Sequence, residues 1–352
     1  MEDSLYTTKQ EMKMKAVYLT KPCFLELRVI EKPVIKDEND VLIKIKSVGV
    51  CGSDIHYYRE GRIGSFVVEE PLILGHESSG VVEEVGKNVK HIKEGDRVAI
   101  EPGVPCRKCE YCKDGRYNLC PDVKFFATPP VNGTFCEYIT HPSDFVYKIP
   151  DNLSFDEATL IEPFSVGIHA SNLVNLRPGE SVIISGLGPV GLLALISAKI
   201  NGANVCGMEK NNSRIEFAKK LGADYVINTG EIDIKEIKNI LKEKFDVVFE
   251  CSGFTGLMEE CIYWVKRGGR VVFIGMGTDI INFNIAYVTV NEIKISGIFR
   301  YANTYKKTIE ILSRNRIELS EMISKRFTLE QVKEALEYPV KNPYCLKVVV
   351  NI

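Results

Sequence analysis

The chain has 352 residues, of which 45% are hydrophobic and 26% are charged, and its formal net charge at pH 7 is −2. This near-neutral balance lacks the electrostatic footprint of a protein that binds nucleic acid or an anionic membrane surface, so neither is expected as a partner. A single hydrophobic core rarely grows beyond about 250–300 residues, so two domains are expected.

The N-terminal segment, MEDSLYTTKQEMKMK, is polar and lacks the apolar stretch of a signal peptide. The most apolar region, residues 182–200, is interrupted by glycines and a proline, and no apolar run reaches the length of a membrane span. A cytoplasmic location is therefore expected. In that reducing compartment, clustered cysteines are more often metal ligands or catalytic groups than disulfides.

Residues 14–100 have the pattern of strands and turns. Short segments rich in Val and Ile are bounded by Gly, Asp and Asn, as in KAVYL, VLIKIKSVGV, SGVVEEVG and DRVAI. Helical patterns are scarce before about Ser154. This part predicts an all-β or barrel-like unit with long functional loops.

Side chains that could hold a metal ion lie in three separate loops. VGVCGSDIH contains Cys51, Ser53, Asp54 and His56, LGHESSG contains His76 and Glu77, and LIEPFSVG contains Glu162. A thiolate, an imidazole and a carboxylate suit a zinc ion that keeps one open coordination position for catalysis. Singly, each residue has an ordinary structural explanation. Their occurrence together with a nucleotide-binding loop, described below, favours a catalytic metal.

Four further cysteines, Cys106, Cys109, Cys112 and Cys120, have the spacing C-x2-C-x2-C-x7-C. Four thiolates can surround one tetrahedral ion, and such a closed site has no open position, so it would be structural. Disulfides fit poorly because neighbouring thiols in a tight loop compete for partners. An iron–sulfur cluster is the stronger alternative.

From Ser181 onward, apolar strands alternate with helical segments. SVIIS, NVCGM, FDVVFE, RVVFIG and EIKISGIF are the expected strands. This alternation is typical of an α/β fold with a doubly wound parallel sheet.

The segment GLGPVG has the pattern G-x-G-x-x-G and contains Gly186, Gly188, Pro189, Val190 and Gly191. It follows an expected strand and precedes an expected helix, as in dinucleotide-binding loops. The first glycine permits a tight turn, the second lets the backbone approach a pyrophosphate, and the third lets the helix pack closely. The helix N-terminus offers amides to the phosphates.

Glu209 ends the next expected strand, roughly 20 residues beyond the loop, where a carboxylate can accept hydrogen bonds from the adenosine ribose. It would also repel a 2′-phosphate, which favours NAD over NADP. Arg214 lies nearby and could stack on the adenine or reach the ribose, so some use of NADP stays open. The alternative is a glycine turn in an α/β domain that binds no nucleotide.

Several longer segments resemble the polyol dehydrogenases of the zinc-containing medium-chain dehydrogenase/reductase family, from about Lys13 to Ile352. They are CGSDIHYYREGRIG, LGHESSGVVEEVG, GDRVAIEPGVPC, GRYNLCPDVKFFATPPVNGTFCEY, LIEPFSVGIHA and FRYANTY. The resemblance implies a GroES-like β-barrel catalytic domain with a structural zinc lobe at 1–163. It also implies an NAD-binding Rossmann domain at 164–302 and a segment at 303–352 that returns to the catalytic domain.

The resemblance also assigns metal ligands. Cys51, His76 and Glu77 match the catalytic zinc ligands, and Glu162 matches a glutamate that holds the zinc-bound water and touches the substrate. Whether Glu77 or Glu162 binds the metal directly stays open. The four clustered cysteines match a structural zinc site.

Polyol and cofactor contacts follow from the same resemblance. Tyr57, Glu162, Arg300 and Tyr301 match polyol-binding positions. The cofactor positions outside the glycine loop are Glu209, Arg214, Ile274, Gly275, Met276, Ile298, Phe299 and Arg300.

The implied reaction is zinc-dependent oxidation of a polyol such as sorbitol, xylitol or L-iditol at C2 to the 2-ketose, with NAD as hydride acceptor. By analogy within the family, Ser53 and His56 would carry the proton away, although His56 could equally be a surface residue. Asp54 would orient His76. Arg300 would hold vicinal hydroxyls or pair with a carboxylate such as Glu162.

Two other classes of function stay open. One is a different zinc dehydrogenase of the family, acting on xylitol, threonine, butanediol or a sugar phosphate. The other is a crystallin-like structural relative without activity. The family also suggests a homotetramer with strands 271–274 and 284–290 near an interface.

Overall fold

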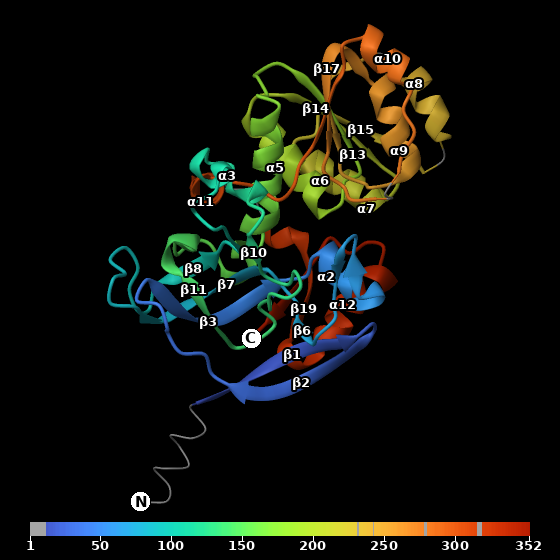
Figure 1. The fold of residues 1–352 in the computed structure, drawn as a ribbon. Helices are drawn as coiled ribbons and strands as arrows, with labels where there is room; N and C mark the ends of the chain where they lie inside the picture. Colours follow the sequence, from blue (N-terminus) through green and yellow to red (C-terminus); the bar gives the residue numbers. More distant parts are fainter. Residues whose placement is uncertain (1–11, 231, 242, 278–279, 315–318) are drawn as a thin grey trace, which may run out of the picture. The chain divides into compact units, whose positions relative to one another are not determined.

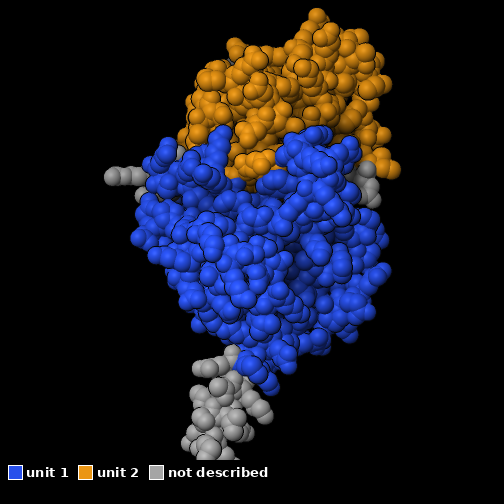
Figure 2. Space-filling view, turned by 60° about the vertical axis from the view of Figure 1, so that its left-hand side comes forward, with its two compact units in different colours: residues 1–162, 305–352 blue, residues 163–304 orange. Residues whose placement is uncertain are grey.

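The computed structural model describes residues 12–352 except 231, 242, 278–279 and 315–318. These residues fall into two compact units (Figures 1 and 2). Unit 1 combines Met1–Glu162 with Tyr305–Ile352, and unit 2 is Pro163–Thr304. The C-terminal segment therefore belongs to the same unit as the N-terminal part of the chain.

Unit 1 is built on a seven-stranded sheet in which every pairing is antiparallel except that of β19 with β20. Its strands, in spatial order, are β12 (Val146–Lys148), β8 (Arg97–Ile100), β7 (Glu77–Val85), β3 (Asp40–Gly49), β20 (Lys347–Asn351) and β19 (Ile323–Thr328), with β11 (Tyr138–Pro142) also paired to β3. The smaller sheets are β2 (Phe24–Glu31) with β1 (Lys13–Lys21) and β6 (Leu72–Ile73), β4 (Arg62–Ile63) with β5 (Phe66–Val67), and β9 (Gly103–Val104) with β10 (Lys124–Phe125).

The helices of unit 1 are short and lie between strands. Among the residues described, they are α2 (Gly52–Glu60), α3 (Glu110–Lys113), α4 (Phe155–Ala158), α11 (Tyr305–Arg314) and α12 (Val332–Lys341). The expectation of strands and turns before Ser154 is right for most of this region but missed α2 and α3. Neither short helix has a strong apolar face to reveal it, because a polar sequence such as GSDIHYYRE lacks helical periodicity.

The C-terminal segment is held in unit 1 by apolar packing and by one half-buried carboxylate. Val350 belongs to the same core cluster as the residues of β1 and β3. Asp156 accepts hydrogen bonds from Ser47 Oγ and Asn351 Nδ2, both at 2.7 Å, and from Arg326 Nε at 2.6 Å. Strands from both ends of the chain therefore share one anchor.

Unit 2 contains a six-stranded sheet in which all pairings are parallel. Its strands, in spatial order, are β15 (Tyr225–Asn228), β14 (Asn204–Glu209), β13 (Ser181–Ser185), β16 (Phe245–Glu250), β17 (Val265–Phe273) and β18 (Lys294–Gly297). Its helices include α5 (Ile161–Leu173, which begins in unit 1), α6 (Pro189–Ile200), α7 (Asn212–Lys220), α8 (Ile237–Ile240), α9 (Thr255–Glu260) and α10 (Ile285–Val290). The strand order reverses at β13, and such a reversal is where doubly wound sheets bind ligands.

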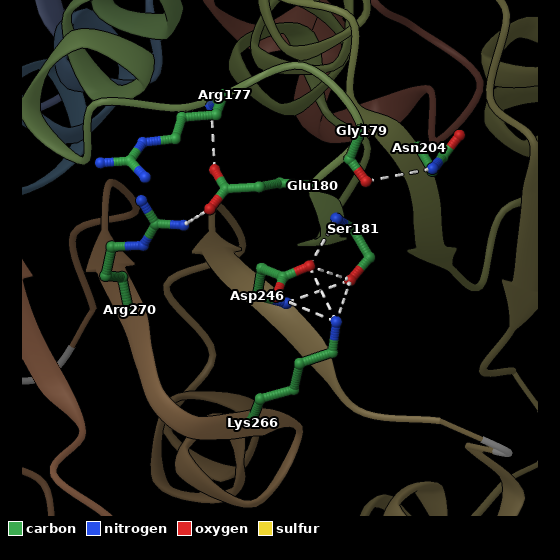
Figure 3. Close-up of polar contacts among 8 residues, drawn as sticks. All are labelled: Arg177, Gly179, Glu180, Ser181, Asn204, Asp246, Lys266 and Arg270. Carbon is green, nitrogen blue, oxygen red and sulfur yellow. Dashed lines mark hydrogen bonds and ion pairs between the residues drawn. The ribbon is translucent and has the colours of Figure 1, made fainter.

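A polar network joins the strands of unit 2 near their amino ends (Figure 3). Asp246 accepts hydrogen bonds from the backbone N–H and the hydroxyl of Ser181, at 2.8 and 2.7 Å, and from Lys266 Nζ at 2.9 Å. Arg270 pairs with Glu180 at 2.5 Å. The network ties β13, β16 and β17 together at the edge opposite the glycine loop.

One expected strand is a helix. Ile285–Val290 form α10, and the side chain of its N-cap, Asn284, accepts a hydrogen bond from Tyr287 N at 3.0 Å. The strand was an implication of the family resemblance. The segment is rich in β-branched residues, but the Asn284 cap and the packing of Tyr287 and Val288 against the apolar core of unit 2 favour a helical turn.

Candidate metal centre and nucleotide site

A buried aspartate connects the loops that carry Cys51 and His76. Asp54, in the first turn of α2, accepts hydrogen bonds from Cys51 N at 3.0 Å and from Gly75 N at 2.9 Å. Its carboxylate lies 3.5 Å from His76 Nδ1. Burial raises the pKa of Asp54, but His76 and the two N–H donors outweigh burial, so the net shift is downward. The imidazole is therefore held by a charged partner.

The structure brings Cys51, His76 and Glu77 together. One possible ligand atom of each lies within 4.8 Å of the others. His76 and Glu77 are buried at the start of β7, and Cys51 is half-buried. Burial lowers the pKa of His76, but the attraction of Asp54 and Cys51 outweighs it and raises the pKa well above its usual value. A metal ligand must be unprotonated, so metal binding here would release a proton.

These donors fit a zinc ion. A thiolate, an imidazole and a carboxylate are ligands that zinc accepts, and three protein ligands leave a position free. Glu77 Oε2 is buried and forms an ion pair with the Lys347 ammonium, so this carboxylate already lies beside a cation.

Glu162, the second residue of α5, is buried but lies outside the group of three possible ligands. The negative charge of Glu162 contributes to raising the pKa of Lys347 and the pKa of Glu101. It is therefore close to the metal centre without belonging to the tight cluster.

Glu101 is a buried carboxylate that the sequence did not reveal as special. It accepts hydrogen bonds from the hydroxyls of Tyr117 at 2.6 Å and Tyr147 at 2.9 Å. Burial raises its pKa to about 7 in spite of these donors. Tyr117 lies in the segment from Cys106 to Cys120, which is called the cysteine lobe below. Glu101 therefore links the cysteine lobe to the core of unit 1.

The expected proton-carrying and substrate-binding residues lie in both units. On α2, Ser53 is half-buried, Tyr57 is buried, and His56 is exposed and paired with Glu60 at 3.2 Å. Arg300 and the buried Tyr301 follow β18 in unit 2. Arg300 has a φ of 57°, a left-handed conformation that is uncommon for residues other than glycine.

The four clustered cysteines also form one group within 4.8 Å. Cys109 Sγ lies 3.4 Å and Cys106 Sγ lies 3.9 Å from Cys112 Sγ, whereas four thiolates around one zinc ion lie about 3.8 Å apart. Backbone N–H donors from Lys108 and Cys109 lower the pKa of Cys106 to about 6. All four cysteines are free of disulfides, so the geometry fits a closed metal site.

The glycine loop joins β13 to α6 as expected. Gly186 has a φ of 86°, and a Cβ there would lie 2.8 Å from Ser252 Cβ. A Cβ at Gly191 would overlap the carbonyl oxygen of Gly186. Gly188 is the N-cap of α6, with Pro189 following it. A side chain at either outer glycine would therefore break the turn.

Glu209 ends β14 and is buried against the loop. Its carboxylate accepts hydrogen bonds from Leu187 N at 3.0 Å, Lys210 N at 2.9 Å and Asn211 N at 3.1 Å. Arg214 Nη1 lies 3.7 Å away. The acid thus fixes the glycine loop, at the strand end where the sequence predicts a contact with the ribose.

The other expected cofactor positions follow strands of the same sheet. Ile274 N and Gly275 N donate to the carbonyl of Glu250 at 2.8 and 2.9 Å. Met276 is 71% exposed. Ile298, Phe299 and Arg300 follow β18, and the Arg300 guanidinium lies 4.5 Å from the Phe299 ring centroid. All of these segments lie at the carboxyl edge of the sheet, where nucleotides bind.

Sequence reasoning missed Lys347. This lysine stands in the otherwise apolar run YCLKVVVNI and is 3% exposed. A charged residue inside a strand whose apolar sequence predicts burial on both faces indicates a buried ion pair, because such a charge needs a partner.

Comparison with known proteins agrees with this geometry. Residues 37–151 match the family "Alcohol dehydrogenase GroES-like domain", and residues 189–314 match "Zinc-binding dehydrogenase". The sorbitol dehydrogenase of Bacillus subtilis is 47% identical over 98% of both chains. The D-xylulose reductase of Saccharomyces cerevisiae is 43% identical over 94% of this chain and 95% of its own.

Solved structures give the same result. An Escherichia coli oxidoreductase of unknown specificity superposes with a TM-score of 0.91 at 38% identity, covering 97% of this chain and 99% of its own. The 2R,3R-butanediol dehydrogenase of Bacillus subtilis has a TM-score of 0.87 at 27% identity, and the match covers 96% of this chain and 99% of that one. The expected fold, a Rossmann sheet with a GroES-like β domain, is confirmed.

A cluster of thiolate, imidazole and carboxylate ligands in one unit, with a dinucleotide loop in the other, defines a zinc-dependent dehydrogenase. The chain is an enzyme of the oxidoreductase class. It belongs to the zinc-binding alcohol dehydrogenase family, within the group of its sorbitol dehydrogenase relatives. Among the helices that the structure describes, none has the length and apolarity to cross a membrane.

Proposed function

We propose that this chain oxidises a polyol such as sorbitol, xylitol or L-iditol at C2 to the 2-ketose, with NAD as the hydride acceptor and zinc as the metal. The observation that carries the proposal is the group of Cys51, His76 and Glu77, which could hold a metal ion, in a chain 47% identical to a sorbitol dehydrogenase. The glycine loop and Glu209 support a nicotinamide cofactor.

The proposed ligands of the catalytic zinc are Cys51, His76 and Glu77, because these three share one group and Glu162 lies outside it. Zinc bound there would act as a Lewis acid that lowers the pKa of a substrate hydroxyl. Asp54 holds the imidazole of His76 in place, and Glu162 supplies a second buried carboxylate for a neighbouring hydroxyl.

The proposed path of the proton starts at Ser53, two residues beyond Cys51, and ends at His56, whose exposed side chain can pass it to solvent. The proposed polyol contacts are Tyr57, Arg300 and Tyr301. The Arg300 guanidinium suits adjacent hydroxyls because its donors have a fixed planar geometry.

In unit 2, the proposed cofactor site consists of the glycine loop, Glu209, Arg214 and the segments after β17 and β18. The Glu209 carboxylate would accept the ribose hydroxyls and repel a 2′-phosphate. The nicotinamide ring of the bound cofactor accepts the hydride. In unit 1, the four clustered cysteines hold a second, structural zinc.

The decisive experiment measures initial rates of NADH formation with sorbitol, xylitol, L-iditol and threonine, each with NAD and with NADP. Turnover of the polyols with NAD, and loss of turnover after chelation with recovery on adding zinc, are expected. Turnover of threonine alone, or full activity in the chelated enzyme, would contradict the proposal.

A preference for xylitol is the second candidate, and the similarity to the Saccharomyces cerevisiae D-xylulose reductase favours it. The ratio of kcat/KM for xylitol and sorbitol decides between the two.

A homotetramer is also part of the proposal. β18 is an edge strand with the part-exposed Ile295, and the neighbouring α10 exposes Ile285 and Val290 by 70% and 73%. Exposed apolar groups beside an unpaired strand edge are suited to association. A cytoplasmic location is proposed because unpaired cysteines serve as metal ligands in reducing compartments.

A further inference from the structure

A buried lysine stands at the proposed metal centre. Lys347 is the first residue of β20, is 3% exposed, and forms an ion pair with Glu77 Oε2. Lysine is almost never fully buried unless it is paired. No step of the proposed reaction uses this side chain.

Three adjacent strands build the space for this pair. Gly49, the last residue of β3, lies opposite Glu77 of β7 and Val349 of β20. A Cβ at position 49 would overlap Glu77 Oε2 and lie 3.0 Å from Lys347 Cε. The pair therefore fills the volume that a side chain at position 49 would occupy.

The surroundings of Lys347 are acidic. Its ammonium group pairs with Glu77 Oε2, both side chains are buried, and a ligand atom of Cys51 lies within 4.8 Å of one of Glu77. The ammonium group thus lies among the same acidic groups that a zinc ion would neutralise. Two cations that share one set of buried anions oppose each other, because charges interact strongly where water is excluded.

We propose that Lys347 is a positioning residue that takes the place of the metal charge: it stabilises the metal-free centre by holding Glu77, and it thereby weakens zinc binding there. The inference rests on the catalytic zinc site of the proposed function. Removing one partner of a buried ion pair leaves an uncompensated charge and is strongly destabilising. In the zinc-loaded protein, the metal supplies that compensation.

The test compares Lys347→Met with the wild-type full chain. Both proteins are stripped with a chelator and titrated with zinc against a chromophoric chelator, and unfolding midpoints are measured with and without zinc. We expect the midpoint of the metal-free variant to fall much more than that of the zinc-loaded variant. By linkage, the affinity of one of the two zinc equivalents rises about tenfold or more.

A lysine with a merely structural role would give a different result. Equal losses of midpoint in both metal states, or a zinc affinity that is unchanged or weaker, would overturn the inference. Lys347→Arg keeps the charge and should leave the affinity near that of the wild type.

Lys266→Met is the matched control, because Lys266 pairs with Asp246 in unit 2 (Figure 3). Lys266→Met should change the unfolding midpoint equally with and without zinc. If Lys347→Met does not fold without zinc, the double variant Glu77→Gln/Lys347→Met removes both charges. Recovery of the metal-free fold supports the inference, and failure to recover it contradicts the inference.

The outcomes also separate this inference from the proposed function. A wild-type chain that binds fewer than two zinc ions would contradict the proposed function. Two bound ions with unaltered affinities in Lys347→Met would contradict only the role of Lys347.

Discussion

At the scale of single residues, the candidate metal centre depends on groups outside its three possible ligands. Asp54 connects the backbone of Cys51 and Gly75 to the imidazole of His76. Two chain segments and one side chain are thus fixed by one carboxylate. Lys347 acts on Glu77 in the same indirect way.

Asp54→Asn should weaken zinc binding at the catalytic centre. The amide oxygen can still accept the hydrogen bond from one N–H, but the charge that fixes His76 is lost. Loss of such a partner typically lowers metal affinity about 10–100-fold. Competition against a chelator measures this, and an affinity equal to that of the wild type would show that His76 is positioned by other contacts.

Glu101→Gln should change how stability depends on pH. The native pKa of Glu101 is raised from 4.5 to about 7, mainly by burial. Stability from this group is therefore complete below pH 4.5 and is lost as pH rises through 7, by at most about 3 kcal/mol. The variant lacks this loss, so its stability relative to the wild type should increase from pH 4.5 to 7.

Denaturant unfolding at several pH values measures that difference. His141, whose pKa burial lowers to about 4, titrates in both proteins and cancels in the comparison. Parallel pH curves for the two proteins would show that Glu101 stays ionised in the native state.

At the scale of elements, the cysteine lobe joins the core of unit 1 through a few contacts. The four thiols lie in one group, and Tyr117 within the lobe donates to Glu101. The short α3 has no buried residues. A segment with so little apolar packing needs another source of stability, which a metal ion supplies.

Cys109→Ser should therefore lower the thermal unfolding midpoint by several degrees. Each kcal/mol of lost unfolding free energy lowers the midpoint by about 2–4 °C in a domain of about 150–250 residues, the size class of unit 1. Cys136→Ser is the matched control, since Cys136 is buried but lies outside both metal-ligand groups. Metal analysis should show one zinc ion lost per chain in Cys109→Ser alone. A normal midpoint and full zinc content would refute a structural zinc at these cysteines.

At the scale of the whole molecule, the sequence predicted the local helices and strands better than it predicted which distant residues are in contact. The glycine loop was predictable because strand, turn and helix are contiguous there, and the two groups of possible metal ligands were predictable by residue type. The pairing of Lys347 with Glu77 was not, since 269 intervening residues (347 minus 77, less one) separate positions that meet only when β20 joins β3.

The remaining errors have local causes. The α10 segment carries β-branched residues that indicate a strand, and only its cap and its packing decide for a helix. The short α2 is stabilised by Asp54 and by Gly61 in a left-handed conformation, rather than by an apolar face. In both α10 and α2, the tertiary environment outweighed the secondary-structure propensity of the sequence.

The assembly can be tested at the edge of the sheet in unit 2. β18 pairs only with β17 among the described strands and carries Ile295, which is 37% exposed. If copies of the chain associate along this edge, a charge there must be buried without a partner, which disfavours the contact. Ile295→Lys should therefore reduce the mass measured by light scattering. Ile200→Lys, at a similarly exposed position at the end of α6, is the control and should leave the mass unchanged. An unchanged tetramer mass for Ile295→Lys would place the interface elsewhere.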